Sequence, residues 1–214
     1  MHSPSRLPVH LPVTRRRRPA RRHAGGAVAA AADGARQPLL ANKSDQFVVA
    51  GNQSWTPAYV ALGSNLDDPP AQVRAAAIAI AALSGVAALQ TSPLYLSAPL
   101  GGLAQPDYVN AVVGFLTTLS AGQLFEQLQG LEAKLGRIRM PGRWAPRRID
   151  LDLLVYGEQK LVRERLTLPH PGIVSRNFVL YPLSDIAPTL EIPGLGPVNR
   201  LRAALGEQGL RRLT

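Results

Sequence analysis

Two aspartates separated by one residue, Asp150 and Asp152, are well suited to hold a hard metal ion. Apolar residues alternate with them, and this period of two predicts a β-strand over residues 149–156. Both carboxylates would then lie on one face, about 7 Å apart along the strand. Such a pair could hold Mg²⁺ against a polyphosphate, where two metals about 4 Å apart would neutralise both sides of a phosphoryl transfer. The polar face of an edge strand would give the same pattern.

An arginine-rich segment, broken by Gly and Pro, comes directly before this strand. It contains Arg137, Arg139, Arg143, Trp144, Arg147 and Arg148. Ion pairing with nearby acids would be one use for these arginines. Arginine also binds phosphate oxygens, and cations that close over a triphosphate stabilise charge that develops in the transition state. Taken with the aspartate pair, the segment predicts a metal-dependent phosphate site.

Other polar and aromatic positions could complete such a site. His170 is the one histidine after residue 57, and the two prolines around it hold it in an extended loop where it could donate to a phosphate or serve the structure. Tyr108 and Asn110 lie two residues apart at a loop-to-strand junction, and a ring beside an amide would suit a flat heterocycle or edge-strand packing. Glu132, on a predicted helix, could face solvent.

The elements that must position these residues follow from apolar periodicity and turn residues. We expect strands over residues 59–62, 86–95, 110–118 and 149–156. The first helix begins after Asp68 and ends before Gly85, and the second begins after Ser120 and ends at Gly136. Shorter helices are expected over residues 178–186 and 198–205. The order β-α-β-β-α-β with C-terminal additions predicts an α+β, ferredoxin-like fold, in which helices cover one face of a largely antiparallel sheet.

The net charge of +10 on the 214 residues is concentrated at the N-terminus. Residues 1–57 hold nine Lys or Arg against two acids, whereas residues 58–214 hold fifteen against twelve. We expect residues 1–57 to be a disordered basic tail and residues 58–214 to form the folded domain. A solvated extension, a start codon placed too far upstream, an organelle transit peptide and an interaction arm all fit the tail.

The composition also limits the partners and the location. There is no cysteine, which excludes disulfides and thiolate metal sites and fits a reducing cytoplasm. No apolar run reaches about 18 residues, so we expect no membrane-spanning helix. A nucleic-acid interaction would rest on the tail alone. We therefore expect a cytoplasmic monomer without nucleic acid, with organelle import through the tail as the alternative.

Four stretches of the sequence together resemble the 6-hydroxymethyl-7,8-dihydropterin pyrophosphokinase family. They are Tyr59-Val60-Ala61-Leu62-Gly63-Ser64-Asn65-Leu66, Gln105-Pro106-Asp107-Tyr108-Val109-Asn110, Gly136-Arg137 with Arg143-Trp144-Ala145-Pro146-Arg147-Arg148-Ile149-Asp150-Leu151-Asp152, and Leu168-Pro169-His170 with Arg176-Asn177-Phe178. The resemblance covers about residues 58–190, and the stretch from Arg143 to Asp152 is highly specific.

The resemblance implies that pyrophosphate passes from Mg-ATP to the hydroxymethyl group of the pterin, with release of AMP, in folate biosynthesis. It implies that Asp150 and Asp152 ligate two Mg²⁺ ions and that Arg137 and Arg147 are catalytic cations. The ATP contacts that it implies are Gln129, Glu132, Arg139, Trp144, His170 and Arg176. The pterin contacts that it implies are Ser97, Pro99, Leu100, Tyr108, Asn110 and Phe178, with the pterin sandwiched between Tyr108 and Phe178. Ala98 and Pro171 depart from the residues common in the family.

Two other functions remain open at the level of the sequence. Another Mg²⁺-dependent phosphotransfer or phosphohydrolase enzyme on the same frame would keep the aspartates and arginines but would not need the aromatic pocket. A nucleic-acid-binding protein that acts through its tail would lose affinity steeply with salt. No residue is an evident general base for the transfer, and none is assigned.

Overall fold

The structure, a computed structural model, describes residues 54–102, 104–137 and 146–213 of the 214-residue chain. These residues belong to one compact unit, Val49–Thr214. Arg139, Arg143 and Trp144 lie outside the described residues, as do residues 1–53 of the expected tail. The roles expected for Arg139 and Trp144 therefore stay predictions.

A six-stranded antiparallel sheet is the framework of the described residues. Its strands are β1 (Thr56–Ser64), β2 (Val86–Thr91), β3 (Tyr95–Ser97), β4 (Tyr108–Thr117), β5 (Asp150–Tyr156) and β10 (Leu210–Arg212). The order across the sheet is β10-β3-β4-β1-β5, and β2 also pairs with β4. Strand β1 is therefore hydrogen-bonded on both sides, to β4 and to β5.

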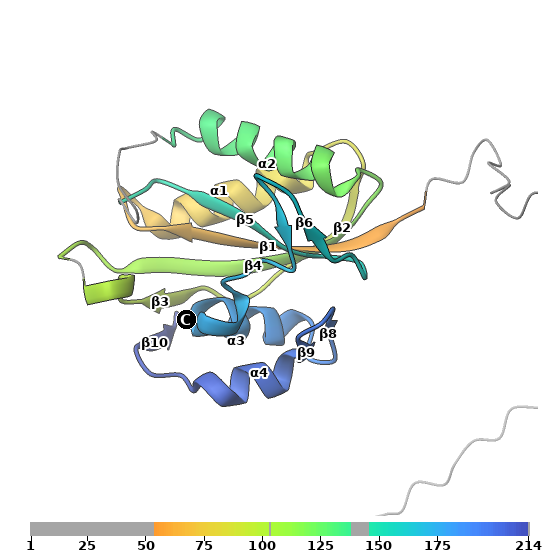
Figure 1. Cartoon of the computed structure of the whole chain (residues 1–214). Coiled ribbons are helices and arrows are strands. Elements are labelled where there is room, and N and C mark those ends of the chain that lie inside the picture. The colour runs from red at the N-terminus through yellow and green to blue at the C-terminus, as the bar shows by residue number, and fades with distance from the viewer. Residues whose placement is uncertain (1–53, 103, 138–145, 214) are drawn as a thin grey trace, which may run out of the picture. The chain divides into compact units, whose positions relative to one another are not determined.

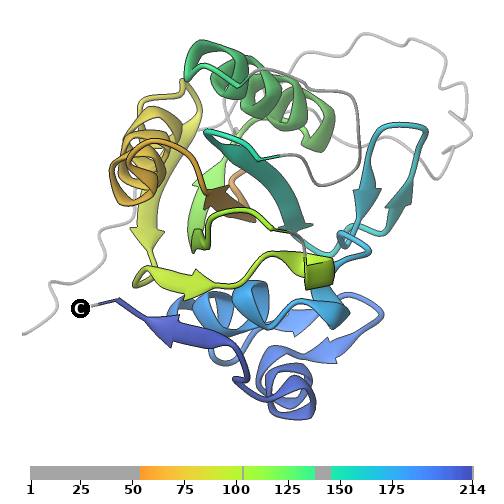
Figure 2. The ribbon, with the colours of Figure 1, turned by 90° about the vertical axis from the view of Figure 1, so that its left-hand side faces the viewer.

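Helices pack on both faces of this sheet. They are α1 (Pro69–Ala81), α2 (Ala121–Lys134), α3 (Asn177–Ile186) and α4 (Val198–Leu205). Figures 1 and 2 show α1 and α2 on one face, and α3 and α4 on the other. Short 3-10 helices span Leu100–Gly102 and Ile173–Ser175, and two small hairpins pair β6 (Leu161–Val162) with β7 (Thr167–Leu168) and β8 (Glu191–Ile192) with β9 (Gly196–Pro197).

The two long helices begin at side chains that cap them. The Asp68 carboxylate accepts a hydrogen bond from the Ala71 N–H at 3.1 Å, and prolines occupy the first turn of α1. Ser120 and Gln123 form a reciprocal capping box at the start of α2. These caps satisfy N–H groups that have no partner within the helix, which fixes where each helix starts.

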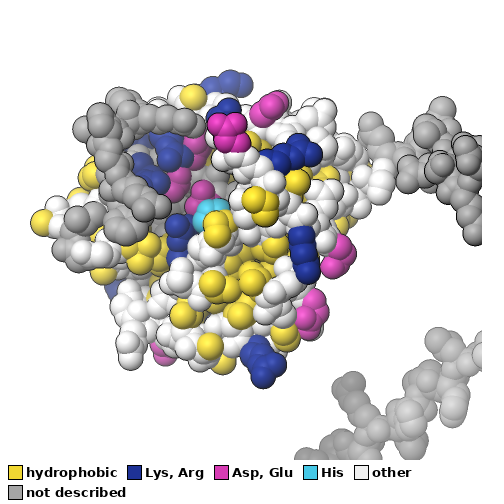
Figure 3. Space-filling view, in the orientation of Figure 1, with side chains coloured by type: hydrophobic (Ala, Val, Ile, Leu, Met, Phe, Trp, Pro, Cys, Tyr) yellow, Lys and Arg dark blue, Asp and Glu magenta, His cyan; other side chains and the backbone are white. Residues whose placement is uncertain are grey.

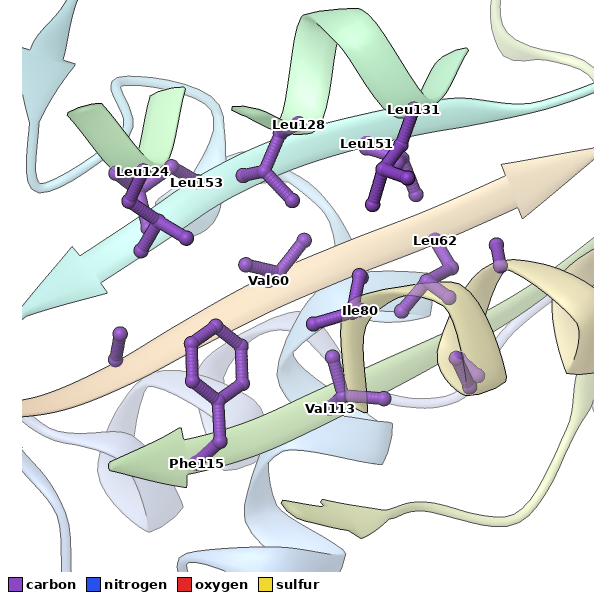
Figure 4. Packing of buried hydrophobic residues seen from close by; sticks show 14 of the residues in the cluster. Val60, Leu62, Ile80, Val113, Phe115, Leu124, Leu128, Leu131, Leu151 and Leu153 are labelled. Carbon is purple, nitrogen blue, oxygen red and sulfur yellow. The ribbon is translucent and has the colours of Figure 1, made fainter. Parts of the chain in front are cut away.

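Side chains that alternate along the strands pack into two apolar clusters, one on each face of the sheet. Figure 4 shows the cluster beneath α1 and α2, where β1, β4 and β5 meet the helices. Its labelled members are Val60, Leu62, Ile80, Val113, Phe115, Leu124, Leu128, Leu131, Leu151 and Leu153. The second cluster lies against α3 and α4 and includes Val112, Leu154, Val155, Val179, Leu180, Leu183 and Val198. The sheet is therefore a buried middle layer.

The mixed α and β architecture with an antiparallel sheet is confirmed, and two expectations need correction. Helices cover one face as expected for α1 and α2, but α3 and α4 cover the other face. The strand expected over residues 86–95 is divided into β2 and β3. Pro93 has no N–H for a ladder, and the Ser92 hydroxyl donates to the Pro93 carbonyl and accepts from the Val112 N–H instead.

Several short elements were not predicted. Strand β10 pairs with β3, and neither small hairpin was expected. Strand β1 begins at Thr56, two residues before the expected domain start. None of the helices in the described parts of the chain is long and apolar enough to cross a membrane.

Candidate active site

The register of the sheet brings the predicted site residues together across β1. Gly63 lies opposite Asn110 of β4 on one side and opposite Asp150 of β5 on the other. Two residues earlier, Ala61 lies opposite Asp152. Because residues two apart in a strand share a face, Ala61 and Gly63 form a floor of small side chains between the β4 and β5 positions.

A cleft opens over this floor, with an empty volume of about 710 Å³ including its open mouth. Its lining residues come from β1, β3, β4, β5, the start of α3 and the loops between them. They are Ala61, Leu62, Gly63, Ser97, Ala98, Leu100, Gln105, Tyr108, Asn110, Arg147, Asp150, Asp152, Arg176, Phe178 and Val179. Figure 3 shows basic and acidic side chains gathered with a histidine around a hollow on one face of the molecule.

Arginines surround the two aspartates at one end of the cleft. One Asp150 carboxylate oxygen lies 2.6 Å from Nη1 of Arg137, and the other lies 2.6 Å from Nη1 of Arg147. Asp152 Oδ2 lies 3.3 Å from Nη1 of Arg176. Burial by itself lowers the pKa of Arg147, but Asp150 and Tyr108 raise it, so this guanidinium keeps its charge. We call these five residues the charged end of the cleft.

His170 stands beside Asp152, with Nε2 at 3.9 Å from Asp152 Oδ2. The Gly172 N–H donates to Nδ1 of His170 at 3.0 Å, so the proton of a neutral ring lies on Nε2. Burial lowers the pKa of His170 and outweighs the opposite effect of the Asp152 charge, while the positive charge of Arg176 acts in the same direction as burial. A neutral imidazole with its one N–H on the side of Asp152 is the result. A Cβ on Gly172 would lie 2.7 Å from the Arg176 guanidinium, so glycine permits this close packing.

Glu132 of α2 is buried beneath this end of the cleft, with 4 % of its surface exposed. Its Oε1 accepts from the Leu151 N–H at 2.8 Å and pairs with the Arg137 guanidinium. Burial raises the pKa of Glu132 to about 7, although both partners act in the opposite direction. The possibility that Glu132 faces solvent is therefore wrong, and the residue ties Arg137 to the strand between the two aspartates.

The opposite end of the cleft carries neutral side chains. Five of the six residues expected to contact a flat heterocycle line the cleft: Ser97, Leu100, Tyr108, Asn110 and Phe178. Pro99 is not among the lining residues. The Asn110 amide nitrogen donates to Ser97 Oγ at 2.9 Å, and Asn110 is 5 % exposed. We call these five lining residues the heterocycle end, where the amide is already fixed and an aromatic ring comes from each of β4 and α3.

The two carboxylates fit a magnesium ion that is shared with a substrate better than a metal ion held by protein ligands alone. Among residues 54–102, 104–137 and 146–213, no group of three or more His, Asp or Glu side chains could hold a metal ion. Mg²⁺ is commonly bound by one or two carboxylates together with substrate phosphates and water. Burial and the nearby charge of Asp150 raise the pKa of Asp152. A divalent cation would relieve this unfavourable charge, so the donor set fits Mg²⁺ with a polyphosphate.

Three expected nucleotide contacts, Gln129, Glu132 and His170, are not among the lining residues of the cleft, and neither is the expected catalytic Arg137. Gln129, on α2, accepts a hydrogen bond at 2.7 Å from Arg165 in the turn between β6 and β7. Glu132 lies beneath the charged end, as described above. Reading the sequence missed Asn65 and Gln105 as site residues, although both stand in stretches that carry the resemblance. It also missed the small floor residues, whose alternation with Val60 and Leu62 along β1 is the signal that could have revealed them.

The cleft has the features of a metal-dependent phosphotransfer enzyme that acts on a small, flat second substrate. Paired carboxylates and arginines occupy one end, and aromatic and amide side chains occupy the other. Residues 59–188 match the model of the 7,8-dihydro-6-hydroxymethylpterin-pyrophosphokinase family. The chain belongs to this family.

Relatives with known names agree with this assignment. The 2-amino-4-hydroxy-6-hydroxymethyldihydropteridine pyrophosphokinase of Pseudomonas aeruginosa is 45 % identical over 155 residues, which cover 72 % of this chain and 95 % of the relative. The Haemophilus influenzae protein of the same name is 48 % identical over 144 residues, covering 67 % and 89 %.

Solved structures show likeness in fold. The crystal structure of wild-type Plasmodium falciparum HPPK-DHPS matches with a TM-score of 0.58 at 12 % identity, over 74 % of this chain and 48 % of that chain. This chain thus spans about half the length of the solved chain that it matches. At this identity the likeness supports the fold and carries no argument about individual residues.

Proposed function

We propose that this chain transfers the pyrophosphoryl group of Mg-ATP to the hydroxymethyl group of 6-hydroxymethyl-7,8-dihydropterin and releases AMP. The observation that carries the proposal is the continuity of one cleft. Asp150, Asp152 and Arg147 line it together with Tyr108 and Phe178. A polyphosphate at the charged end and a flat ring at the heterocycle end would therefore face each other over the same floor.

The reaction then needs no covalent enzyme intermediate. The substrate hydroxyl oxygen attacks the β-phosphorus, and the bond between this phosphorus and the oxygen bridging to the α-phosphate breaks. AMP leaves with that oxygen, and the hydroxyl proton is released to water. Positioning of the two substrates and electrostatic stabilisation of the transferred group can supply most of the rate in such a transfer.

Each group at the charged end has a role in this proposal. Asp150 and Asp152 would hold two Mg²⁺ ions, which would supply charge neutralisation at the phosphates when bound. Arg137 and Arg147 are ion-paired to Asp150 in this structure. In the transition state, some of their N–H groups would instead donate to phosphate oxygens. Arg176 and neutral His170 would donate to the triphosphate.

The heterocycle end would select and orient the pterin. Tyr108 and Phe178 would hold the ring between them, and aromatic stacking of this kind is weak in energy but strict in geometry. Asn110 would hydrogen-bond the ring edge, since its amide is buried and already oriented by Ser97. Leu100 and Ser97 would close the remaining sides, with Pro99 acting from outside the lining.

We further propose a ferredoxin-like frame and a cytoplasmic monomer. The order β5-β1-β4, with β2 and β3 pairing with the outer side of β4 and two helices on one face, supports the ferredoxin-like plan. The absence of cysteine fits a reducing cytoplasm. Residues 1–57 have no role in the proposed reaction.

Incubation with Mg-ATP and 6-hydroxymethyl-7,8-dihydropterin, followed by chromatography of all products, tests the proposal. We expect AMP and a pterin diphosphate in equal amounts. The matched control is the pterin with a methyl group in place of hydroxymethyl, which fits the same pocket but has no nucleophile and should yield no AMP. ADP with a pterin monophosphate as the main products would contradict pyrophosphoryl transfer.

A further inference from the structure

Asn65 joins three segments of the chain at the edge of the cleft and has no part in the roles given above. The residue follows β1 directly and is 2 % exposed. Its amide nitrogen donates to Gln105 Oε1 and to the Pro106 carbonyl, each at 3.2 Å. Its amide oxygen accepts from the Arg147 N–H at 2.9 Å, and its own N–H donates to the Arg147 carbonyl at 3.2 Å.

The two partner segments belong to opposite ends of the cleft. Gln105 lines the cleft, and Gln105-Pro106 leads into β4, whose first residue is Tyr108 of the heterocycle end. Arg147 belongs to the charged end, where it pairs with Asp150, and its side chain also interacts with Tyr108. These contacts span 40, 41 and 82 residues of sequence, so they fix loops against each other and do not form a local turn.

The chemistry of the contact calls for an amide. An Asn side chain offers two N–H donors and an acceptor within one rigid plane, so it can satisfy carbonyl-type oxygens on one side and a backbone N–H on the other. A carboxylate of the same shape could serve the Arg147 side only, and an alkyl group could serve neither side. Because the residue is buried, each lost bond leaves its partner without a replacement from solvent.

We infer that Asn65 is a positioning residue that holds the heterocycle end and Arg147 at a fixed separation, so that the bound pterin hydroxyl and the phosphates meet. The inference rests on the proposed function. Asn65 itself touches no reacting atom: it acts on the pterin through Gln105-Pro106 and on the phosphates through the main chain of Arg147.

Two variants separate the two sides of the contact. Asn65→Ala loses both sides, so we expect kcat to fall about 30-fold and the KM for pterin to rise about tenfold, with the KM for ATP within about threefold of wild type. Asn65→Asp keeps an acceptor for the Arg147 N–H. On the other side, however, its carboxylate has no N–H to donate to Gln105 Oε1 and the Pro106 carbonyl oxygen. We expect it to show the raised KM for pterin with kcat within about fivefold of wild type.

Thr117→Val is the matched structural control. Thr117 is fully buried at the far end of β4, where its hydroxyl donates to the Gly85 carbonyl at 2.8 Å and accepts from the Leu119 N–H at 3.1 Å. This variant also removes buried hydrogen bonds and should lower the melting temperature, but it should leave kcat and both KM values unchanged. Amide hydrogen exchange at Arg147 adds a readout without catalysis: exchange should be faster in Asn65→Ala and close to wild type in Asn65→Asp.

The outcomes decide separately between the inference and the proposed function. A wild-type chain that makes no pterin diphosphate contradicts the proposed function. A wild-type chain that makes it, while both Asn65 variants lose only stability as Thr117→Val does, overturns the positioning role alone. Asp and Ala variants with the same kcat and the same Arg147 exchange would also overturn it, because the amide oxygen would then have no effect on Arg147.

Discussion

The two ends of the cleft are built on different principles. At the charged end, each carboxylate lies against guanidinium groups, and the Asp150 oxygens are both engaged by Arg137 and Arg147. At the heterocycle end, the polar groups are neutral, and Asn110 is held by Ser97 within the sheet. In the proposed reaction, the first end would exchange its internal partners for phosphate and metal, whereas the second would take its ligand without such an exchange.

Under the proposed function, this difference would separate catalysis from recognition. Charged groups that bind the phosphates only during the reaction stabilise the transition state more than the ground state. Their loss should therefore lower kcat. A preformed neutral pocket binds substrate and transition state alike, so its loss should raise KM. Variants at each end of the cleft test that division.

Replacement of either aspartate should nearly abolish turnover. We expect Asp150→Asn and Asp152→Asn to lower kcat by about 1,000-fold or more, because an amide is a poor ligand for Mg²⁺ and leaves the phosphate charge without its counterion. Initial rates across a Mg²⁺ titration measure this. The free energy of unfolding of Asp152→Asn should be no lower than that of wild type, because burial disfavours the charge of the Asp152 carboxylate that the variant removes. Near-normal rates in both variants would indicate that Asp150 and Asp152 have only a structural role.

Replacement of the arginines should lower kcat by about 100-fold, with a smaller change in the affinity for ATP. Arg137→Ala and Arg147→Ala remove the contacts to Asp150 that we expect to pass to the transferred group. Arg147→Lys is the matched control: it keeps the charge but loses the planar guanidinium, so its kcat should lie between wild type and alanine. Rapid-quench rates together with equilibrium binding of ATP make the comparison. Equal losses in ATP affinity and in kcat would contradict a role in the transition state.

Removal of an aromatic ring at the other end should act on the pterin. We expect Tyr108→Ala and Phe178→Ala to raise the KM for pterin about tenfold or more while kcat changes less. Tyr108→Phe keeps the ring and tests the ring alone: the KM for pterin should stay near that of wild type, although the variant removes the hydroxyl that contacts Arg147. Steady-state kinetics with pterin varied at saturating ATP measures the effect. The division between the two ends fails if kcat falls more than KM rises.

Glu132 beneath the charged end predicts a dependence of stability on pH. Its pKa is raised by burial to about 7, so folding favours the protonated form. This contribution is complete below about pH 4.5, the value for the unfolded chain, and is lost as the pH rises through about 7, a change of about 3 kcal/mol in the free energy of unfolding.

Denaturant unfolding of Glu132→Gln at pH 5 and pH 8 measures this contribution. Glutamine keeps an acceptor for the Leu151 N–H, so the variant should lose less stability than wild type between the two pH values. Glu126→Gln, at an exposed position of the same helix, should behave as wild type does. An unchanged dependence on pH in Glu132→Gln would contradict the burial argument.

The smallest effect is expected from the N-terminal region. A chain that begins at Trp55 retains all of β1, whose first residue Thr56 pairs with Thr117, and every residue assigned to chemistry. We expect its melting temperature, kcat and both KM values to match those of the full chain, and calorimetry with steady-state kinetics measures them. Limited proteolysis of the full chain should cut first between Arg15 and Arg36. A tenfold loss of activity would show that residues before Trp55 contribute to the domain and that the expected boundary is wrong.

Local patterns were enough to predict much of the framework. Alternation around Asp150 and Asp152 predicts β5, and the caps at Asp68 and Ser120 predict where α1 and α2 begin. The burial of Glu132 could also have been inferred, because it lies four residues after buried Leu128 on α2. Period and capping act over a few residues, which is why they can be read from a sequence.

Long-range contacts could not be predicted in this way. The hydrogen bond between Asn65 and Arg147 joins residues 82 apart, and no local period encodes it. Strand β10 is three residues long, too short for alternation to stand out, and its pairing with β3 depends on the path of α4. The placement of α3 on the second face likewise depends on Val112 and Leu154 of the sheet, which share a buried cluster with Val179 and Leu183 of the helix.

ATP labelled at a single phosphorus atom distinguishes pyrophosphoryl transfer from every other transfer. The wild-type chain is given the pterin alcohol with ATP labelled at the α- or the β-phosphorus in separate reactions. Transfer of pyrophosphate predicts that the β label appears in the pterin product and the α label in AMP, at equal rates. A β label that stays with the nucleotide as ADP, or that appears as free phosphate without a labelled pterin, would contradict pyrophosphoryl transfer.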